Sequence, residues 1–414
     1  MLAIVARFLR AKSTYARLDH TRRRIEARSL LRLLIVSRPF DICIVTGIFP
    51  PDTGGPAKFA EAFLNWGKLT GIKVAVISLT NKEDQIQNVP NSRITLISRQ
   101  RRFVSRFVRS VLAIRSMMNQ GVPILANGMF LETLIARYLG VPFLKYSTKI
   151  PGDIVWERAR NSGVTRLGID EFQTAKLSLR YRIFRTLFSA SLRKSTSVVV
   201  PSSHLRKLAQ TWGVRENNVN LIFNSIDLEH FAFNKNCGAE FDVMTVCRLV
   251  KWKGVEELVR ACSELDLALA IIGDGPERES LERLSVELNA RVTFFGEVDQ
   301  SQLPELLTRA SAFVLNSSFE ATSYALIEAR AIGLFSIARS NTGSEEVITH
   351  TFDGLLCGPE TMNLHEALSV YKEDKAFVSK CVERARTDCE TRFNQSSNFE
   401  RIYNLVQTSR GFHQ

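Results

Sequence analysis

The sequence predicts an α/β protein built from two doubly wound domains in tandem, and three observations lead to this prediction. The 414 residues are enough for two or three domains of ordinary size. From residue 41 onward, short apolar runs alternate with amphipathic stretches, as in parallel sheets covered by helices on both faces. This alternation stops in the linker-like segment 231–240 and then starts again.

The expected elements follow one another through both halves of the chain. In the first half, strands are predicted at 41–46, 73–79, 123–126, 142–146 and 197–200, and helices at 57–68 and 132–139. In the second half, strands are predicted at 242–246, 268–272, 292–295, 312–315 and 334–338, and helices at 255–265, 278–288, 303–309 and 325–332. The tail reads as helical from 375 to 406.

These elements divide the chain into four parts. We expect a basic N-terminal extension at 1–38, a first domain at 39–232, a second domain at 240–390, and a C-terminal helix at 391–414 that packs back on the first domain. Doubly wound sheets bind ligands beyond the carboxyl ends of their strands. With two such sheets, the cleft between the domains is the expected site.

Positive charge is concentrated in two segments of a chain whose formal net charge is +13. Residues 1–38 hold ten Lys or Arg and two acidic residues, and residues 93–115 hold seven Arg and no acidic residue. The rest of the chain is therefore close to neutral. Such patches imply an anionic partner, which is a lipid surface, a nucleic acid or a phosphorylated substrate.

The segment 99–115 is predicted to form a basic amphipathic helix. At 100° per residue, one half-turn holds Phe103, Val104, Phe107, Val108, Val111 and Leu112, and the opposite side holds Arg102, Arg106 and Arg109. This pattern is typical of a helix on an anionic membrane surface. The alternative is an ordinary helix with its apolar face in the core. Nucleic acid is disfavoured because no known reader motif accompanies the charge.

Other sequence features indicate the cellular compartment of the protein. The seven cysteines are scattered and form no Cys-x-x-Cys, which favours a reducing compartment and argues against a zinc site. No apolar run reaches the ~18 residues that a membrane-spanning helix needs. Arginines interrupt the apolar start of the chain, so a secretory signal is disfavoured. We therefore expect a cytoplasmic protein.

Two segments at predicted strand ends carry candidate chemistry for an anion. Gly54 and Gly55 precede the helix at 57–68, where glycines allow backbone N–H groups to approach an anion; a purely structural turn is the alternative. Arg248 and Lys253 follow the strand at 242–246. Two cations there suit a leaving diphosphate, and a pair of solvated surface charges is the alternative.

Two more segments follow later strands. Gly273 begins a tight turn that we expect to line the cleft, and Arg278 replaces the last glycine of a dinucleotide fingerprint. Glu320 and Glu328 flank the start of a predicted helix. Thr322 or Ser323 is expected to cap this helix, and its free N–H groups to hold a phosphate. On spacing alone, two chance glutamates are the alternative.

The four segments, taken in this order, resemble the family-4 retaining glycosyltransferases of the GT-B fold, also called glycosyl transferases group 1. The resemblance covers about residues 41–400 and includes the segments 200–203, 223–227 and 342–348. It implies two Rossmann-like domains facing each other across a cleft. It also implies transfer of a sugar from a nucleotide diphosphate to an acceptor hydroxyl, with the anomeric configuration kept. The first domain would then serve the acceptor and the second the nucleotide sugar.

The resemblance also assigns roles to individual residues. Arg248 and Lys253 would bind the donor diphosphate, Glu320 would contact the transferred sugar near its reacting carbon, and Glu328 would hold the ribose hydroxyls. The implied donor-binding residues are Gly54, Gly55, Arg248, Lys253, Gly273, Glu320, Thr322, Ser323, Tyr324, Ala325 and Glu328.

The lack of one motif argues against the metal-dependent GT-A type of glycosyltransferase, and two features depart from the patterns of related enzymes. No Asp-x-Asp occurs, so we expect no metal and no cofactor, with Arg248 and Lys253 acting in place of a metal. Many relatives carry a histidine in the loop that corresponds to 147–153, which has none here. Asp153 is predicted to position the acceptor or the sugar as a catalytic residue, with a helix cap as the alternative. Ala321 stands where glycine is common, which implies a tighter pocket.

The sequence thus predicts a metal-independent hexosyltransferase, peripheral on the cytoplasmic face of a membrane. Its partners would be a nucleotide-sugar donor, a carbohydrate or lipid-linked acceptor and an anionic lipid surface, and it would build a polysaccharide, a glycolipid or a lipid-linked oligosaccharide. The alternatives are an enzyme with a soluble acceptor, a nucleotide-sugar epimerase, and a non-catalytic protein that binds sugar nucleotides or anionic surfaces.

Overall fold

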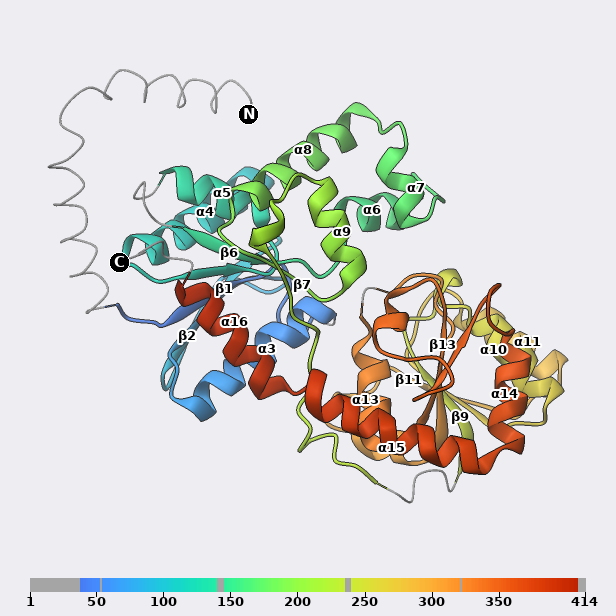
Figure 1. Cartoon of the computed structure of the whole chain (residues 1–414). Coiled ribbons are helices and arrows are strands. Elements are labelled where there is room, and N and C mark those ends of the chain that lie inside the picture. Colours follow the sequence, from blue (N-terminus) through green and yellow to red (C-terminus); the bar gives the residue numbers. More distant parts are fainter. Residues whose placement is uncertain (1–37, 53, 140–144, 235–239, 321, 409–414) are drawn as a thin grey trace, which may run out of the picture.

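The computed structural model describes residues 38–52, 54–139, 145–234, 240–320 and 322–408, and it contains two α/β domains that face each other (Figure 1). The basic segment 1–37, Ala321 and residues 409–414 lie outside the described residues. The predictions made for the N-terminal extension and for Ala321 therefore stay predictions.

The first domain is built on an eight-stranded sheet with the order β3-β4-β2-β1-β5-β6-β7-β8. Neighbouring strands are parallel, except for the antiparallel pair β3 and β4. The strands are β1 Ile42–Val45, β2 Val74–Thr80, β3 Gln85–Val89, β4 Ser92–Ser98, β5 Ile124–Ala126, β6 Tyr146–Lys149, β7 Val198–Val200 and β8 Val219–Leu221. The central strands are apolar on both faces because helices cover both.

Helices cover this sheet on two sides. One face packs against α3 (Gly55–Thr70) and α16 (Gln395–Thr408). The other face packs against α4 (Phe103–Asn119) and α5 (Phe130–Leu139). Four more helices form a separate cluster around β7 and β8, namely α6 Ile154–Asn161, α7 Ile169–Thr174, α8 Leu179–Lys194 and α9 Ser203–Thr211. The short 3-10 helix η1 (Glu216–Asn218) leads into β8.

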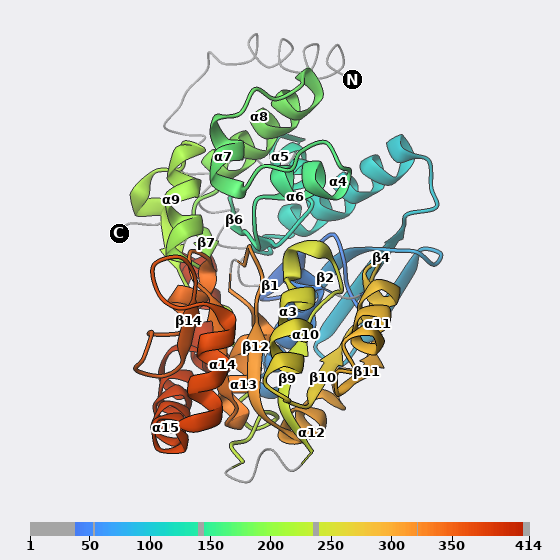
Figure 2. The same cartoon turned by 90° about the vertical axis from the view of Figure 1, so that its right-hand side faces the viewer.

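The second domain has an all-parallel sheet with the order β11-β10-β9-β12-β13-β14 (Figure 2). Its strands are β9 Phe241–Val246, β10 Leu269–Ile272, β11 Val292–Gly296, β12 Ala310–Leu315, β13 Phe335–Arg339 and β14 Leu355–Cys357. One face packs against α12 Leu303–Thr308, α13 Tyr324–Ile332 and α15 Lys375–Arg392. The other packs against α10 Val255–Glu264, α11 Arg278–Glu287 and α14 Leu364–Glu373. Two 3-10 helices, η2 Lys251–Lys253 and η3 Gly343–Glu346, follow β9 and β13.

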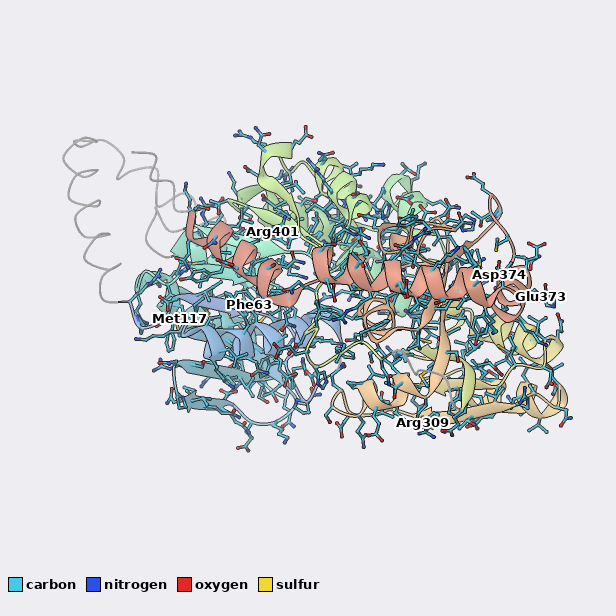
Figure 3. The ribbon with its side chains drawn as sticks, turned by 60° about the horizontal axis from the view of Figure 1, so that its bottom comes forward. Phe63, Met117, Arg309, Glu373, Asp374 and Arg401 are labelled. Carbon is cyan, nitrogen blue, oxygen red and sulfur yellow. The ribbon has the colours of Figure 1, made fainter. Side chains whose placement is uncertain are left out.

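The C-terminal tail returns from the second domain to the first. The predicted single helix at 375–406 is two helices, because α15 ends at Arg392 and α16 begins at Gln395. At the break, Asn394 bridges to Ile226, where the chain first crosses between the domains. Phe399 of α16 then packs against Phe59 and Phe63 of α3, with ring centroids 5.5 and 5.0 Å apart. Figure 3 shows α15 and α16 running along both domains, with Phe63 near α16.

The predicted elements agree best with the structure in the second domain. All nine predicted strands and helices of that domain end within two residues of the observed bounds. In the first domain, the strand predicted at 142–146 overlaps β6 only at Tyr146, and 142–144 lie outside the described residues. The hairpin of β3 and β4, the helices α6, α7, α8 and α9, and the strand β8 were not predicted, nor were β14 and α14 of the second domain.

Helix α4 confirms the core-facing alternative for its C-terminal half, and contact of its exposed side with a membrane stays a prediction. Its C-terminal half packs on the sheet through the buried residues Val111, Ile114, Met117 and Met118. Four apolar side chains remain exposed, namely Phe103 at 58%, Val104 at 71%, Val108 at 47% and Leu112 at 51%. The predicted single apolar half-turn is therefore split into a core face and an exposed stripe. Among the described residues, no helix is both long and apolar enough to cross a bilayer.

Candidate active site

The start of α13 is a capped helix end, as predicted. Ser323 is the N-cap, and its hydroxyl accepts a hydrogen bond from the N–H three residues on, at 3.4 Å. Thr322, the other predicted cap, is buried and donates instead to the Pro201 carbonyl of the first domain, at 2.6 Å. The first N–H groups of a helix lack acceptors within the helix. Tyr324 and Ala325 thus present such groups at the positive end of the helix dipole.

Lys253 and Glu320 form an ion pair beside this helix start. Their side chains are only 18% and 14% exposed. Burial lowers the pKa of Lys253, and the Glu320 carboxylate more than offsets this, so the pKa lies above its usual value. Gly254 follows with a left-handed φ of 63°, and a Cβ there would lie 2.5 Å from the Asn316 carbonyl oxygen. Only glycine fits this close approach of η2 to the end of β12.

Arg248 lies on the same strand end as Lys253, between β9 and η2, and its predicted role at the diphosphate stays a prediction. It lies two residues beyond β9, and its side chain is exposed. In the part of the chain that the structure describes, no hydrogen bond or ion pair joins Arg248 to Lys253 or Glu320. Gly273, with φ 124°, packs so closely on the Cys247 carbonyl that any Cβ would overlap it. Gly273 thus allows the turn after β10 to pack against the end of β9, next to Arg248.

The glycine pair of the first domain reaches the α13 start from the other side. Gly54 is the N-cap of α3, with a φ of 140° that favours glycine. A Cβ on Gly55 would lie 3.8 Å from the Tyr324 ring, so this loop is in contact distance of α13. Burial raises the pKa of the Tyr324 hydroxyl, and the negative charge of Glu328 adds to this. The structure therefore joins the first and fourth predicted segments across the two domains.

Glu328 lies at the bottom of this junction, and its side chain is 1% exposed. It forms an ion pair with Lys58 of α3, and the Gln300 amide nitrogen lies 3.4 Å from the same carboxylate oxygen. Lys58 and Gln300 were missed by sequence reasoning. The available signal for Lys58 was its place in the first turn of the helix, three residues after Gly55.

Asp153 does not act as predicted. It is buried, and its Oδ1 accepts hydrogen bonds from the N–H groups of Val155 at 2.9 Å and Trp156 at 3.1 Å. Its Oδ2 accepts from Gln173 at 3.0 Å and Arg185 at 3.2 Å. Both carboxylate oxygens are thus engaged within the first domain. The helix-cap alternative is confirmed, and the fully buried carboxylate does not reach an acceptor.

The segment 147–153 contains a lysine that sequence reasoning passed over. Lys149 ends β6, is 3% exposed, and donates to the side-chain amide oxygen (Oδ1) of Asn224 at 3.0 Å. The Asn224 amide nitrogen in turn donates to the Thr322 carbonyl at 3.0 Å. Burial lowers the pKa of Lys149 to about 8. A chain of hydrogen bonds therefore runs from the first sheet to the glutamate segment.

Glu157 lies next to this segment, on α6. Its carboxylate covers Gly152 so closely that a Cβ on Gly152 would overlap it. Burial raises the pKa of Glu157 to about 7, and the nearby Asp153 charge adds to the effect.

A cavity of about 690 Å³ opens between the domains on the side of α6, α7 and α9. Among the predicted site residues, only Glu320 lines it. Its aromatic walls are Trp156 and Phe319, which meet edge to face at 4.6 Å, and Trp252 of η2. The polar wall includes Arg160 and Glu345. This cavity adjoins the Lys253–Glu320 pair and offers aromatic faces and charged groups to a second ligand.

The arrangement suits an elongated anionic ligand. A buried cation and the leading N–H groups of α13 can stabilise phosphate oxygens, and the two glutamates can accept hydrogen bonds from hydroxyls on either side. Within the described residues, no three His, Cys, Asp or Glu side chains are grouped so as to hold a metal ion.

Comparisons with known proteins agree with the predicted resemblance. Residues 227–388 match the model of the family described as glycosyl transferases group 1. The lipopolysaccharide core biosynthesis glycosyltransferase LpsD of Rhizobium meliloti is 35% identical over 162 residues, which cover 38% of this chain and 46% of LpsD. N-acetyl-alpha-D-glucosaminyl L-malate synthase of Bacillus anthracis is 32% identical over 164 residues, which cover 37% of this chain and 42% of that enzyme. The chain thus spans less than half the length of each relative.

Solved structures confirm the GT-B fold. A sucrose-phosphate synthase from Thermosynechococcus elongatus superposes with a TM-score of 0.71 at 20% identity, over 89% of this chain and 98% of that one. The Anabaena protein HepE, solved in complex with UDP and glucose, superposes with a TM-score of 0.68 at 16% identity, over 89% and 100%. At these identities the likeness establishes the architecture and nothing finer.

Proposed function

We propose that this chain, whose residues 227–388 match the model of the glycosyl transferases group 1 family, is a retaining, metal-independent glycosyltransferase. Its donor would be a sugar linked to a nucleoside diphosphate. One observation carries the proposal. The Lys253–Glu320 pair and the N-terminus of α13 lie together against the Gly54–Gly55 loop of the opposite domain.

The reaction follows from the chemistry of these groups. The bond between the sugar's anomeric carbon and the diphosphate oxygen breaks, and the electron pair leaves with the diphosphate. Lys253 and the α13 N–H groups stabilise the growing negative charge. The acceptor oxygen forms its bond on the same face of the sugar, and its proton passes to the departing phosphate oxygen. Glu320 orients the sugar hydroxyls, and Glu328 those of the ribose.

The acceptor enters, in this proposal, through the cavity beside Glu320. Aromatic faces such as Trp252, with carboxylates and an arginine around them, suit a saccharide. Support for the donor class comes from HepE, which was solved with UDP and glucose. Support for the acceptor class comes from LpsD, whose name places it in lipopolysaccharide core synthesis. We therefore propose a polysaccharide or lipid-linked saccharide as the acceptor.

We expect one of UDP, GDP and ADP to raise the melting temperature of the full chain. A ligand at a hundred times its dissociation constant adds about 2.7 kcal/mol to the free energy of unfolding. The stabilisation should be the same in EDTA, because the protein's own cations bind the diphosphate. A thermal-shift titration with each nucleotide, with and without EDTA, measures both effects.

Inorganic phosphate and free glucose are the matched control ligands for this titration. If none of the three nucleotides stabilises the chain more than these controls, the proposed donor class is wrong. If the stabilisation disappears in EDTA and returns with Mg²⁺ or Mn²⁺, the metal-independent part is wrong.

We also propose that the enzyme works at an anionic membrane surface through α4. Val104, Val108 and Leu112 form an exposed stripe at a spacing of four residues, along one side of this helix. Leu112 also lines a groove with the exposed Ile86 of β3. Arg102, at the N-terminus of α4, is exposed as well. Apolar side chains next to arginines are the combination that inserts into anionic lipid headgroups.

Replacing Val104, Val108 and Leu112 together by serine should weaken binding to phosphatidylglycerol vesicles by about tenfold or more, because each side chain loses apolar burial in the lipid. The Val286→Ser variant is the control, since Val286 of α11 is 80% exposed but lies in the other domain. Sedimentation with vesicles measures the bound fraction. Equal binding by the triple variant and the wild type would exclude this stripe as the contact.

A further inference from the structure

Lys58 of the first domain forms an ion pair with the buried carboxylate of Glu328 in the second domain. Lys58 lies in the first turn of α3, and its ammonium also lies 5.1 Å from the centre of the Tyr324 ring, at the start of α13. The Lys58 side chain is 26% exposed and that of Glu328 is 1% exposed. The pair therefore links the two domains, with the lysine as its more exposed member.

A ligand that hydrogen-bonds to Glu328 Oε1 has to compete with this ion pair. The carboxylate oxygen that accepts from Lys58 also has the Gln300 amide within 3.4 Å, so it is already crowded. Removing the lysine without a substitute would leave a buried, unpaired carboxylate, which is strongly unfavourable. Hydroxyl groups of a ligand can replace the lysine as donors to that oxygen.

The displaced lysine would remain close to the phosphate-binding groups. Gly55, one turn earlier in α3, lies within contact distance of Tyr324 at the leading end of α13. A lysine has a flexible four-carbon stem and three donors, so its ammonium can turn from one partner to another. Lys253, a second lysine at this place, is likewise held by a carboxylate, that of Glu320.

We propose that Lys58 is a diphosphate-binding residue that Glu328 holds in the absence of donor. This inference rests on the proposed function. When the ribose hydroxyls of the donor reach Glu328, they take the place of the ammonium, and Lys58 turns onto the diphosphate. The exchange leaves both charges paired, and it couples recognition of the nucleoside to recognition of the phosphates. Lys58 also brings the first domain into the donor site.

The test compares a nucleoside diphosphate with its nucleoside. Dissociation constants for UDP and uridine, GDP and guanosine, and ADP and adenosine are measured on the full chain by calorimetry. In Lys58→Met, the tighter-binding diphosphate should lose about tenfold to a hundredfold in affinity, the range for a charge-assisted hydrogen bond. Its nucleoside should bind as well as before or more tightly, because it no longer competes with the lysine.

Lys68→Met is the matched control, because Lys68 lies on the same helix, is exposed and hydrogen-bonds only to Asn65 among the described residues. Lys68→Met should change neither the affinity for the nucleoside diphosphate nor that for the nucleoside. Glu328→Gln is the second variant. It releases Lys58 and weakens the ribose contact, so the preference for the diphosphate over the nucleoside should rise.

The outcomes separate this inference from the proposed function. If the wild type binds none of the three diphosphates, both are overturned. If the wild type binds one of them and Lys58→Met leaves the preference for it over its nucleoside unchanged, only the role of Lys58 is overturned. Should Lys58→Met not fold, an unchanged preference in Glu328→Gln overturns that role in the same way.

Discussion

Replacing Lys253 with alanine should lower the rate of sugar transfer by about 10²–10³-fold, the cost of removing one preorganised group from a site where negative charge develops. Lys253 is largely buried and paired with Glu320. Its loss removes the buried cation that faces the leaving diphosphate, and it leaves the Glu320 carboxylate without its partner. Both effects raise the barrier. Steady-state rates with the donor identified by thermal shift measure the change.

Lys251→Ala is the control for this experiment. Lys251 belongs to the same 3-10 helix, but its side chain is exposed on the outer side, where it lines a different groove. We expect its rate to stay close to that of the wild type. If Lys253→Ala also keeps at least a third of the wild-type rate while folded, the leaving diphosphate is not stabilised by this cation.

The parts of the fold that depend on local pattern could be predicted from the sequence. In the second domain, strands such as β10 and β12 are buried on both faces, so they appear as continuous apolar runs between helices with one apolar side. The cap of α13 at Ser323 is a local feature of the same kind. The glutamate segment and Lys253 follow strands whose carboxyl ends share one edge of the sheet, so their meeting also follows from the topology.

The parts that depend on contacts between distant segments could not be predicted in this way. Asp153 is of a residue type that often acts in active sites, but its partners Gln173 and Arg185 come from helices that the sequence did not indicate. The Lys58–Glu328 pair joins residues 270 positions apart in the chain. The exposed flank of α4 exists because the sheet covers only one side of that helix. The sequence periodicity alone does not show which apolar residues face the sheet and which face solvent.

Arg330 anchors the helix that begins the donor site, and its replacement should have the largest effect on stability. Its side chain is fully buried, although it belongs to a type that seldom is. It donates to the Asp353 carboxylate and carbonyl, both at 2.9 Å, and lies 3.4 Å from Asp388 of α15. Arg330→Met keeps most of the volume and leaves Asp353 buried without its partner. We expect a loss of about 3–5 kcal/mol in the free energy of unfolding.

Urea unfolding, followed for the transition of the second domain, measures this loss against Arg260→Met. Arg260 pairs with Glu256 on the exposed face of α10, where an ion pair contributes at most about 1 kcal/mol. Adding Asp353→Asn to Arg330→Met should recover part of the stability, because the unpaired charge is then gone. If Arg330→Met lowers the free energy of unfolding no more than Arg260→Met does, the charge of Arg330 does not hold α13 against α15. The packing of α13 on β12 and β13 would then suffice to fix the helix start that faces the donor.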